Sequence, residues 1–230
     1  MVCCDFTLMT GAESPRTVYE TMRDLCSSVG TSAYWDDDSD HWINYPPRRV
    51  DTVAQDPVQY VTSADWRDRV MVAVAGEPEV LRRLAENELS LPVVSALASN
   101  PHCPADAFSR IIDIATEDSD CLDELLCLVA DHPNIDRETA ERLIDVGKRH
   151  PNHQYRWEFL QVLVANPVVP EDILEATVVA FPDLVGSLRR NPATADSRRL
   201  SLLCNLVEGD PKYRHQPELL TADLDALLTP

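Results

Sequence analysis

Apolar residues in this chain recur every three or four positions, in short runs separated by turns that contain proline. This spacing places the apolar side chains on one face of an α-helix. The runs predict helices over residues 66–75, 78–84, 91–99, 104–116, 121–131, 136–148, 155–165, 170–180, 183–190 and 195–207, with a last helix over 218–228. Two helices and a turn, repeated about five times, are typical of a stacked repeat in which each unit covers the apolar face of its neighbour. We therefore expect an all-α solenoid.

The turns inside the helix pairs share a proline, and in four of them asparagine or histidine precedes it. A residue before proline is disfavoured in the α conformation, so the first helix of each pair should end there. Asparagine also tolerates the left-handed conformation that closes many helices, and we expect the turn asparagines to adopt this conformation. Pro104 and Pro170 are then predicted as first helical residues, Thr194 as an N-cap, and Thr62 with Asp65 as a capping box. The predicted structural turn residues are Asn100, Pro101, His132, Pro133, Asn166, Pro167, Asn191 and Pro192.

Residues 1–62 do not follow the repeat. An amphipathic run from Pro15 to Val29 predicts a helix, and residues 31–49 form a polar loop that includes Trp35 and Trp42. We expect residues 1–62 to be a helical capping segment with an aromatic and acidic loop, and residues 63–230 to be the solenoid domain.

Two turns resemble a known family. The segments from Ser99 to Asp106 and from Ala165 to Leu174 each contain an Asn-Pro turn, a second proline and an acidic residue. The second segment continues into a leucine-bearing helix. This pattern resembles the bacterial leucine-rich repeat variant family over roughly residues 64–208, although proline spacings of 32 and 34 residues exceed that family's short repeat. The resemblance implies a right-handed helical superhelix related to HEAT-type arrays, with an interaction role. Some members carry an iron–sulfur cluster, but the cysteines before residue 62 lack the ligand run, so we do not expect one.

Acidic residues strongly outnumber basic ones, 39 to 20, and give a net charge of −19. Phosphate backbones attract the opposite sign, so nucleic acid is an unlikely partner. The acid excess is compatible with solubility, with a partner that has a basic surface, or with imitation of a nucleic acid. The sequence has neither an 18-residue apolar run nor the pattern of a secretory signal, which predicts a cytoplasmic protein without a membrane span.

Catalytic and metal-binding motifs are missing from the sequence. Its seven cysteines form no C-x-x-C pair, and the Asp36, Asp38, Asp40 alternation has His41 where a calcium loop requires glycine. His132 and His150 both precede a Pro-Asn pair, which suits a turn better than catalysis. We expect no enzyme activity, no metal and no cofactor.

Three clusters are predicted as partner-binding surfaces. Arg189, Arg190, Arg198 and Arg199 flank one turn, where they either form a basic spot or pair with acids of neighbouring repeats. The other two are Tyr155 with Arg156, and the Trp35 and Trp42 loop, which is either exposed or buried against the first repeat. We expect a protein-binding scaffold. The alternatives are an acidic inhibitor that mimics nucleic acid and, more weakly, nucleic-acid binding through the arginine edge.

Overall fold

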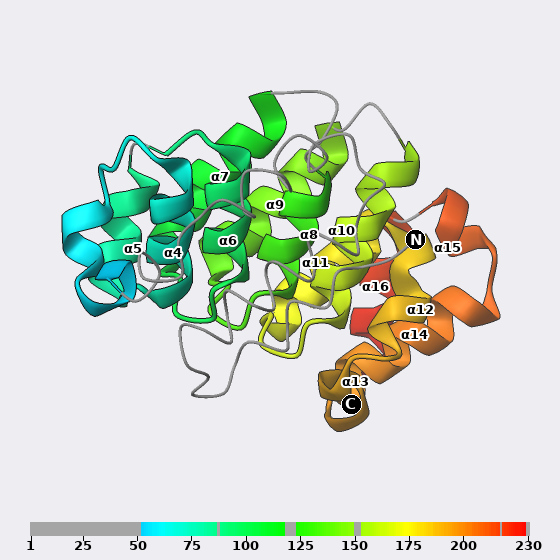
Figure 1. The fold of residues 1–230 in the computed structure, drawn as a ribbon. Helices are drawn as coiled ribbons and strands as arrows, with labels where there is room; N and C mark the ends of the chain where they lie inside the picture. Colours follow the sequence, from blue (N-terminus) through cyan, green and yellow to red (C-terminus); the bar gives the residue numbers. More distant parts are fainter. Residues whose placement is uncertain (1–51, 87, 118–122, 150–152, 217, 229–230) are drawn as a thin grey trace. The chain divides into compact units, whose positions relative to one another are not determined.

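The computed structural model describes residues 52–86, 88–117, 123–149, 153–216 and 218–228, and all regular secondary structure within them is helical (Figure 1). The all-α prediction is therefore confirmed for these residues. The chain divides into two compact units, Met1–Ile111 and Ile112–Pro230. The predicted capping helix and the loop with Trp35 and Trp42 lie outside the described residues. None of the described helices is long and apolar enough to cross a membrane.

In the first unit, the long-range contacts centre on one helix. The elements are η2 (Pro57–Tyr60), α4 (Trp66–Ala75), α5 (Pro78–Ala85), α6 (Leu91–Ser99) and the start of α7 (Ala105–Glu117). Helix α4 packs against η2, α5 and α6. The core that holds them together contains the fully buried side chains of Val70, Met71, Leu81, Leu97 and Phe108. This burial of apolar surface is the main stabilising term for the unit.

The start of α4 differs from the predicted capping box. Asp65, and not Thr62, is the N-cap, because the Asp65 carboxylate accepts the backbone N–H of Arg67 at 3.1 Å. The Ser63 hydroxyl supports this cap by accepting the Asp65 N–H at 3.2 Å, and it donates at 2.6 Å to Asp68, which is fully buried. The predicted capping box therefore lies about one turn too early: Asp65 is the N-cap, and Asp68 is the acidic residue in the first turn.

The second unit contains the rest of α7 and the other helices. They are α8 (Asp123–Asp131), α9 (Arg137–Arg149), α10 (His153–Ala165), α11 (Glu171–Ala180), η3 (Pro182–Leu184), α12 (Val185–Leu188), α13 (Pro192–Asp196), α14 (Arg198–Gly209), α15 (Lys212–His215) and α16 (Glu218–Leu228). Across both units, the bounds predicted for α4, α6 and α16 are confirmed at both ends, and most others differ by one or two residues.

Two rows of helices build the second unit. Helices α8, α10 and α12 contact one another in that order, and we call them the first row. Helices α9, α11 and α14 form the second row: α9 contacts α11, α11 contacts α14, and α16 packs on α14 and α11. The rows meet closely at Gly147 of α9, where a Cβ would lie 2.7 Å from the buried Leu160 of α10. Any side chain at this position would force the fully buried Leu160 side chain to shift.

The predicted helix over 195–207 is wrong at its start. The short helix α13 begins directly after Asn191, which caps it, and the chain breaks at Ser197 in an extended conformation. The Ser197 hydroxyl then caps α14 by accepting the N–H of Leu200 at 3.1 Å. Thr194 lies inside α13, and its hydroxyl donates to the carbonyl oxygen of Leu188 at 2.6 Å. Pro104 and Pro170 likewise precede the first helical residue instead of occupying it.

Candidate functional site

The turn asparagines are buried and bind the chain at the end of an earlier helix. In the first unit, the Asn100 amide donates to the carbonyl oxygens of Ala73 at 2.7 Å and Val74 at 3.1 Å, both at the end of α4. The side-chain oxygen of Asn100 accepts the backbone N–H of His102 at 2.8 Å. One side chain therefore shapes its own turn and joins that turn to the preceding helix.

The same arrangement occurs twice in the second unit. The Asn166 amide donates to the carbonyl oxygens of Ala130 at 2.8 Å and His132 at 3.2 Å. The Asn191 amide donates to those of Val164 at 2.8 Å and Asn166 at 3.0 Å. Each asparagine also accepts the N–H two residues ahead, and both are at most 4% exposed. Because the bonds run from turn to turn, we call this set the turn ladder.

His132 occupies the position of an asparagine in the turn ladder. Its Nδ1 accepts the backbone N–H of Asn134 at 3.0 Å, as the asparagine oxygens do, and its side chain is 4% exposed. Its carbonyl oxygen accepts the bond from Asn166. An imidazole nitrogen accepts a hydrogen bond only while it carries no proton, so this contact uses an unprotonated Nδ1.

The predicted left-handed turn conformation is wrong for the described residues, none of which has a positive φ. Asn100 has φ −78° and ψ 117°, and Asn191 has φ −69° and ψ 127°, which is extended backbone. The proline ring that follows favours this region, and its influence exceeds the tolerance of asparagine for the left-handed one.

Arginine–carboxylate pairs join the helices of the second row. Arg137 of α9 holds Asp172 of α11 through two hydrogen bonds of 2.7 and 2.9 Å. This guanidinium lowers the pKa of the Asp172 carboxyl below its usual value. Arg199 of α14 donates to the Glu175 carboxylate of α11 from Nε and Nη2, and its Nη2 also lies 2.8 Å from the Asp225 carboxylate of α16. Arg142 of α9 pairs with Asp113 of α7, and in the first unit Arg82 of α5 pairs with Asp106 of α7 at 2.7 Å.

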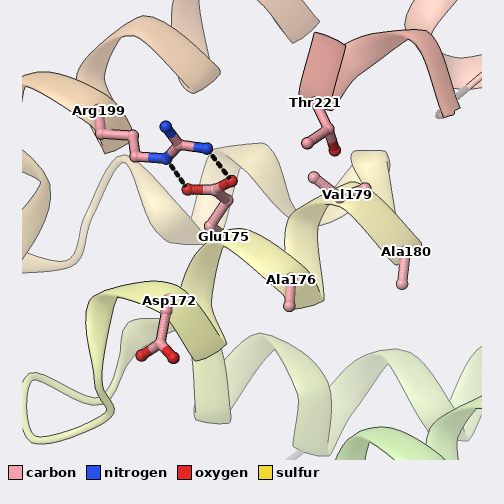
Figure 2. A pocket seen from close by; sticks show the side chains of 7 residues that line it. All are labelled: Asp172, Glu175, Ala176, Val179, Ala180, Arg199 and Thr221. Atoms are coloured by element: carbon pink, nitrogen blue, oxygen red, sulfur yellow. Dashed lines mark hydrogen bonds and ion pairs between the residues drawn. The ribbon is translucent and has the colours of Figure 1, made fainter. Parts of the chain in front are cut away.

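A depression of about 470 Å³ lies on the second row, between α11, α14 and α16. Figure 2 shows Arg199 and Glu175 bonded to each other above it, with the small side chains of α11 below. Because Arg199 and the carboxylates Asp172 and Glu175 are engaged in pairs, they offer no unpaired charge to a ligand. Its lining residues are Asp172, Glu175, Ala176, Val179, Ala180, Arg199 and Thr221.

The four arginines predicted as a basic spot have different surroundings. Arg189 bonds Glu208 at 2.5 and 3.0 Å, and Arg199 bonds the carboxylates on α11 and α16. Arg190 donates to the Ser187 hydroxyl at 3.0 Å, whereas Arg198 is exposed. Two of the four charges are therefore neutralised within the chain. Tyr155 and Arg156 belong to α10, but their side chains lie outside the described residues.

The sequence did not single out the outward face of the first row. Leu128 of α8 and Val162 of α10 are half-buried there, and each follows a glutamate of its own helix by four residues, Glu124 and Glu158 respectively. Among the described residues, neither glutamate has a lysine or arginine within ion-pairing distance. In the sequence, the glutamate and the apolar residue are four positions apart in both runs. That the two pairs share one surface follows only from the packing of α8 against α10.

Comparison with known proteins gives no matching family model, no matching protein and no matching solved structure. Among the described residues, no three histidine, cysteine or acidic side chains lie close enough to hold a metal ion. Any function assigned to this chain must therefore be argued from its own sequence and structure.

Proposed function

We propose that this chain is a right-handed superhelix of paired helices, similar to leucine-rich repeat variant and HEAT-like arrays, and that it is a non-enzymatic scaffold for protein recognition. The observation that carries the proposal is the turn ladder. Asn100, Asn166 and Asn191 make the same pair of bonds to carbonyl oxygens of an earlier turn or helix end. One joint used repeatedly is what a stacked repeat requires.

The distribution of charge supports recognition by the first row. In the second row, Asp172 and Glu175 are matched by arginines of adjacent helices, which makes that surface self-complementary. The first row instead combines half-buried apolar side chains with glutamates that have no cationic partner among the described residues. Such a surface suits a partner protein with basic residues.

An acidic inhibitor that mimics nucleic acid is the second proposal, favoured by the net charge of −19. It requires regularly spaced, unpaired carboxylates along one face. The pairing of Arg189 and Arg199 with carboxylates gives no support to nucleic-acid binding through the arginine edge. A cytoplasmic location stays a prediction.

Affinity purification with the immobilised full chain, followed by mass spectrometry, tests these proposals. A scaffold should retain a specific protein whose release increases with salt and does not depend on DNA. A nucleic-acid mimic should retain a DNA-binding protein, which duplex DNA then displaces. Recovery of no saturable partner at any salt concentration would contradict both. Small-angle X-ray scattering tests the superhelix separately, because a compact globular profile is incompatible with it.

A further inference from the structure

We propose that the outward face of α8, α10 and α12 binds an amphipathic helix of a partner protein, and that the polar border of this helix is basic. The inference rests on the proposed function, and it assigns both the surface and the chemistry of the partner. The surface, here called the first-row face, consists of Glu124, Leu128, Glu158, Val162 and Gly186.

The apolar centre of the first-row face comes from equivalent positions on adjacent helices. Leu128 and Val162 are half-buried, while their neighbours Val129 and Leu163 point into the core and are fully buried. On α12 the only exposed position is Gly186, and a Cβ built there meets nothing within 4 Å. Among the described residues, the face therefore carries one partly exposed apolar side chain on each of two helices, and at the third helix the space around Gly186 is open.

The charge of the first-row face determines the sign of the charge on the polar border of the partner helix. Glu124 is exposed, Glu158 is half-buried, and neither is paired with a lysine or arginine of the described chain. The side chains of Asp172 and Glu175 on the second row are instead bound by arginines. A docked helix that covered Glu124 and Glu158 without cations would leave these carboxylates poorly solvated, which is costly. Lysine or arginine along one border removes that cost and speeds the encounter.

A helix fits this face better than an extended strand does. Helical side chains at positions i, i+3, i+4 and i+7 form a continuous apolar stripe, and their long basic neighbours can lay their methylene stems over apolar surface. The described face offers no strand edge for β-augmentation, because every regular element in the described residues is helical. Recognition must therefore come from side-chain contacts.

The probe is a fluorescent 14-residue amphipathic peptide of leucine and lysine, with a scrambled peptide of equal composition as its control. We expect saturable binding of the amphipathic peptide to the full chain and at least about tenfold weaker binding of the scrambled one. Hydrogen exchange should show protection confined to α8, α10 and α12. The double substitution Glu124→Lys and Glu158→Lys should raise the Kd about tenfold or more.

A matched glycine pair separates local contact from overall charge. Gly186→Arg puts a large cation on the first-row face, whereas Gly209→Arg puts the same cation at the end of α14, where a Cβ also meets nothing within 4 Å. We expect a Kd increase of about tenfold for Gly186→Arg and less than about twofold for Gly209→Arg. Circular dichroism and melting curves check that both variants remain folded.

Four outcomes overturn the inference: no saturable binding, equal binding of the scrambled peptide, equal effects of the two glycine variants, or protection on other helices. A specific protein captured by affinity purification whose binding is unaffected by Gly186→Arg would retain the proposed scaffold function while rejecting this face. Failure of the proposed function and failure of this inference are thereby distinguished.

Discussion

The side-chain amide of Asn166 donates a hydrogen bond to the carbonyl oxygen of His132, 34 residues earlier in the chain, at 3.2 Å. The two residues occupy successive turns, so one turn is fixed directly to the turn before it. Both side chains are about 4% exposed, which excludes water as a ready substitute partner. The joint between two helix pairs is therefore polar, although the surrounding core is apolar.

Replacing Asn166 should destabilise the protein strongly. Asn166→Ala leaves the carbonyl oxygens of Ala130 and His132 without this donor and removes the acceptor for the N–H of Val168. We expect a loss of about 2–3 kcal/mol in the free energy of unfolding, measured by urea denaturation. The exposed Gln161→Ala change on α10 should alter it by less than about 0.5 kcal/mol. Equal effects of the two substitutions would show that the hydrogen bonds of Asn166 do not stabilise the fold.

The buried His132 can be tested against the residue that it replaces. His132→Asn should preserve the turn, because the asparagine oxygen can accept the N–H of Asn134, whereas His132→Leu should destabilise the fold by about 1–3 kcal/mol. Urea denaturation of the three proteins at neutral pH measures this difference. Equal stabilities of His132→Asn and His132→Leu would contradict the assigned hydrogen bond.

Two glycines should respond differently to replacement by alanine. Gly147→Ala places a Cβ 2.7 Å from the buried Leu160 side chain and should destabilise the protein by about 1–3 kcal/mol. Gly209→Ala meets open space at the end of α14 and should be neutral or stabilise it by up to about 1 kcal/mol. Thermal melting of both variants measures these changes in stability. A melting temperature unchanged by Gly147→Ala would show that α9 and α10 can separate without cost.

The pair of Arg137 and Asp172 predicts a specific dependence on pH. Because Arg137 lowers the pKa of Asp172 in the folded state, the pair stabilises the fold above the unfolded value of about 3.9. That stabilisation is lost as the pH falls below this value. The wild type should therefore exceed Arg137→Met in urea midpoint near neutral pH, and the difference should disappear in strong acid.

A control for this prediction is Arg83→Met, since exposed Arg83 has no ionic partner among the described residues. Its difference from the wild type should not depend on pH between about 2 and 7, the range that spans carboxylate titration. A constant difference for Arg137→Met over the same range would contradict the role of the pair.

Cys103 should resist alkylation in the folded protein. Burial raises the pKa of its thiol to about 12, and the thiolate is the reactive form. Iodoacetamide at mildly alkaline pH should modify the less buried Cys127 well before Cys103, and denaturant should abolish this order. Peptide-level mass spectrometry over time distinguishes the two residues. Early modification of Cys103 would mean that the turn before α7 opens in the native state.

The sequence predicted the helices because their apolar faces repeat at a helical period, and it located the turns because proline excludes the preceding residue from the α conformation. It failed where two local signals competed. Asn100 and Asn191 are extended because the following proline overrides asparagine's tolerance of positive φ. Ser197 divides a run of apolar spacing because its hydroxyl caps α14. Such competition depends on side-chain geometry that periodicity does not contain.

The candidate surfaces were less predictable than the fold. The arginines before and after the Asn191 turn are close in sequence, but Arg189 pairs with Glu208 and Arg199 with Glu175, which lies 24 residues earlier. Pairing at that distance depends on which helices are neighbours. The same holds for the glutamates of the first row. Glu124 and Glu158 lie on one surface because α8 packs against α10, and the sequence alone does not reveal this packing.

The acceptors of the turn ladder have an evolutionary consequence. Every asparagine amide in it binds main-chain carbonyl oxygens, which all amino acids possess. A neighbouring unit can therefore change nearly all of its side chains and still receive the bond. Copies that arose by duplication could diverge beyond recognition while their connection persisted, and a whole pair of helices could be gained or lost without the need to redesign the joint.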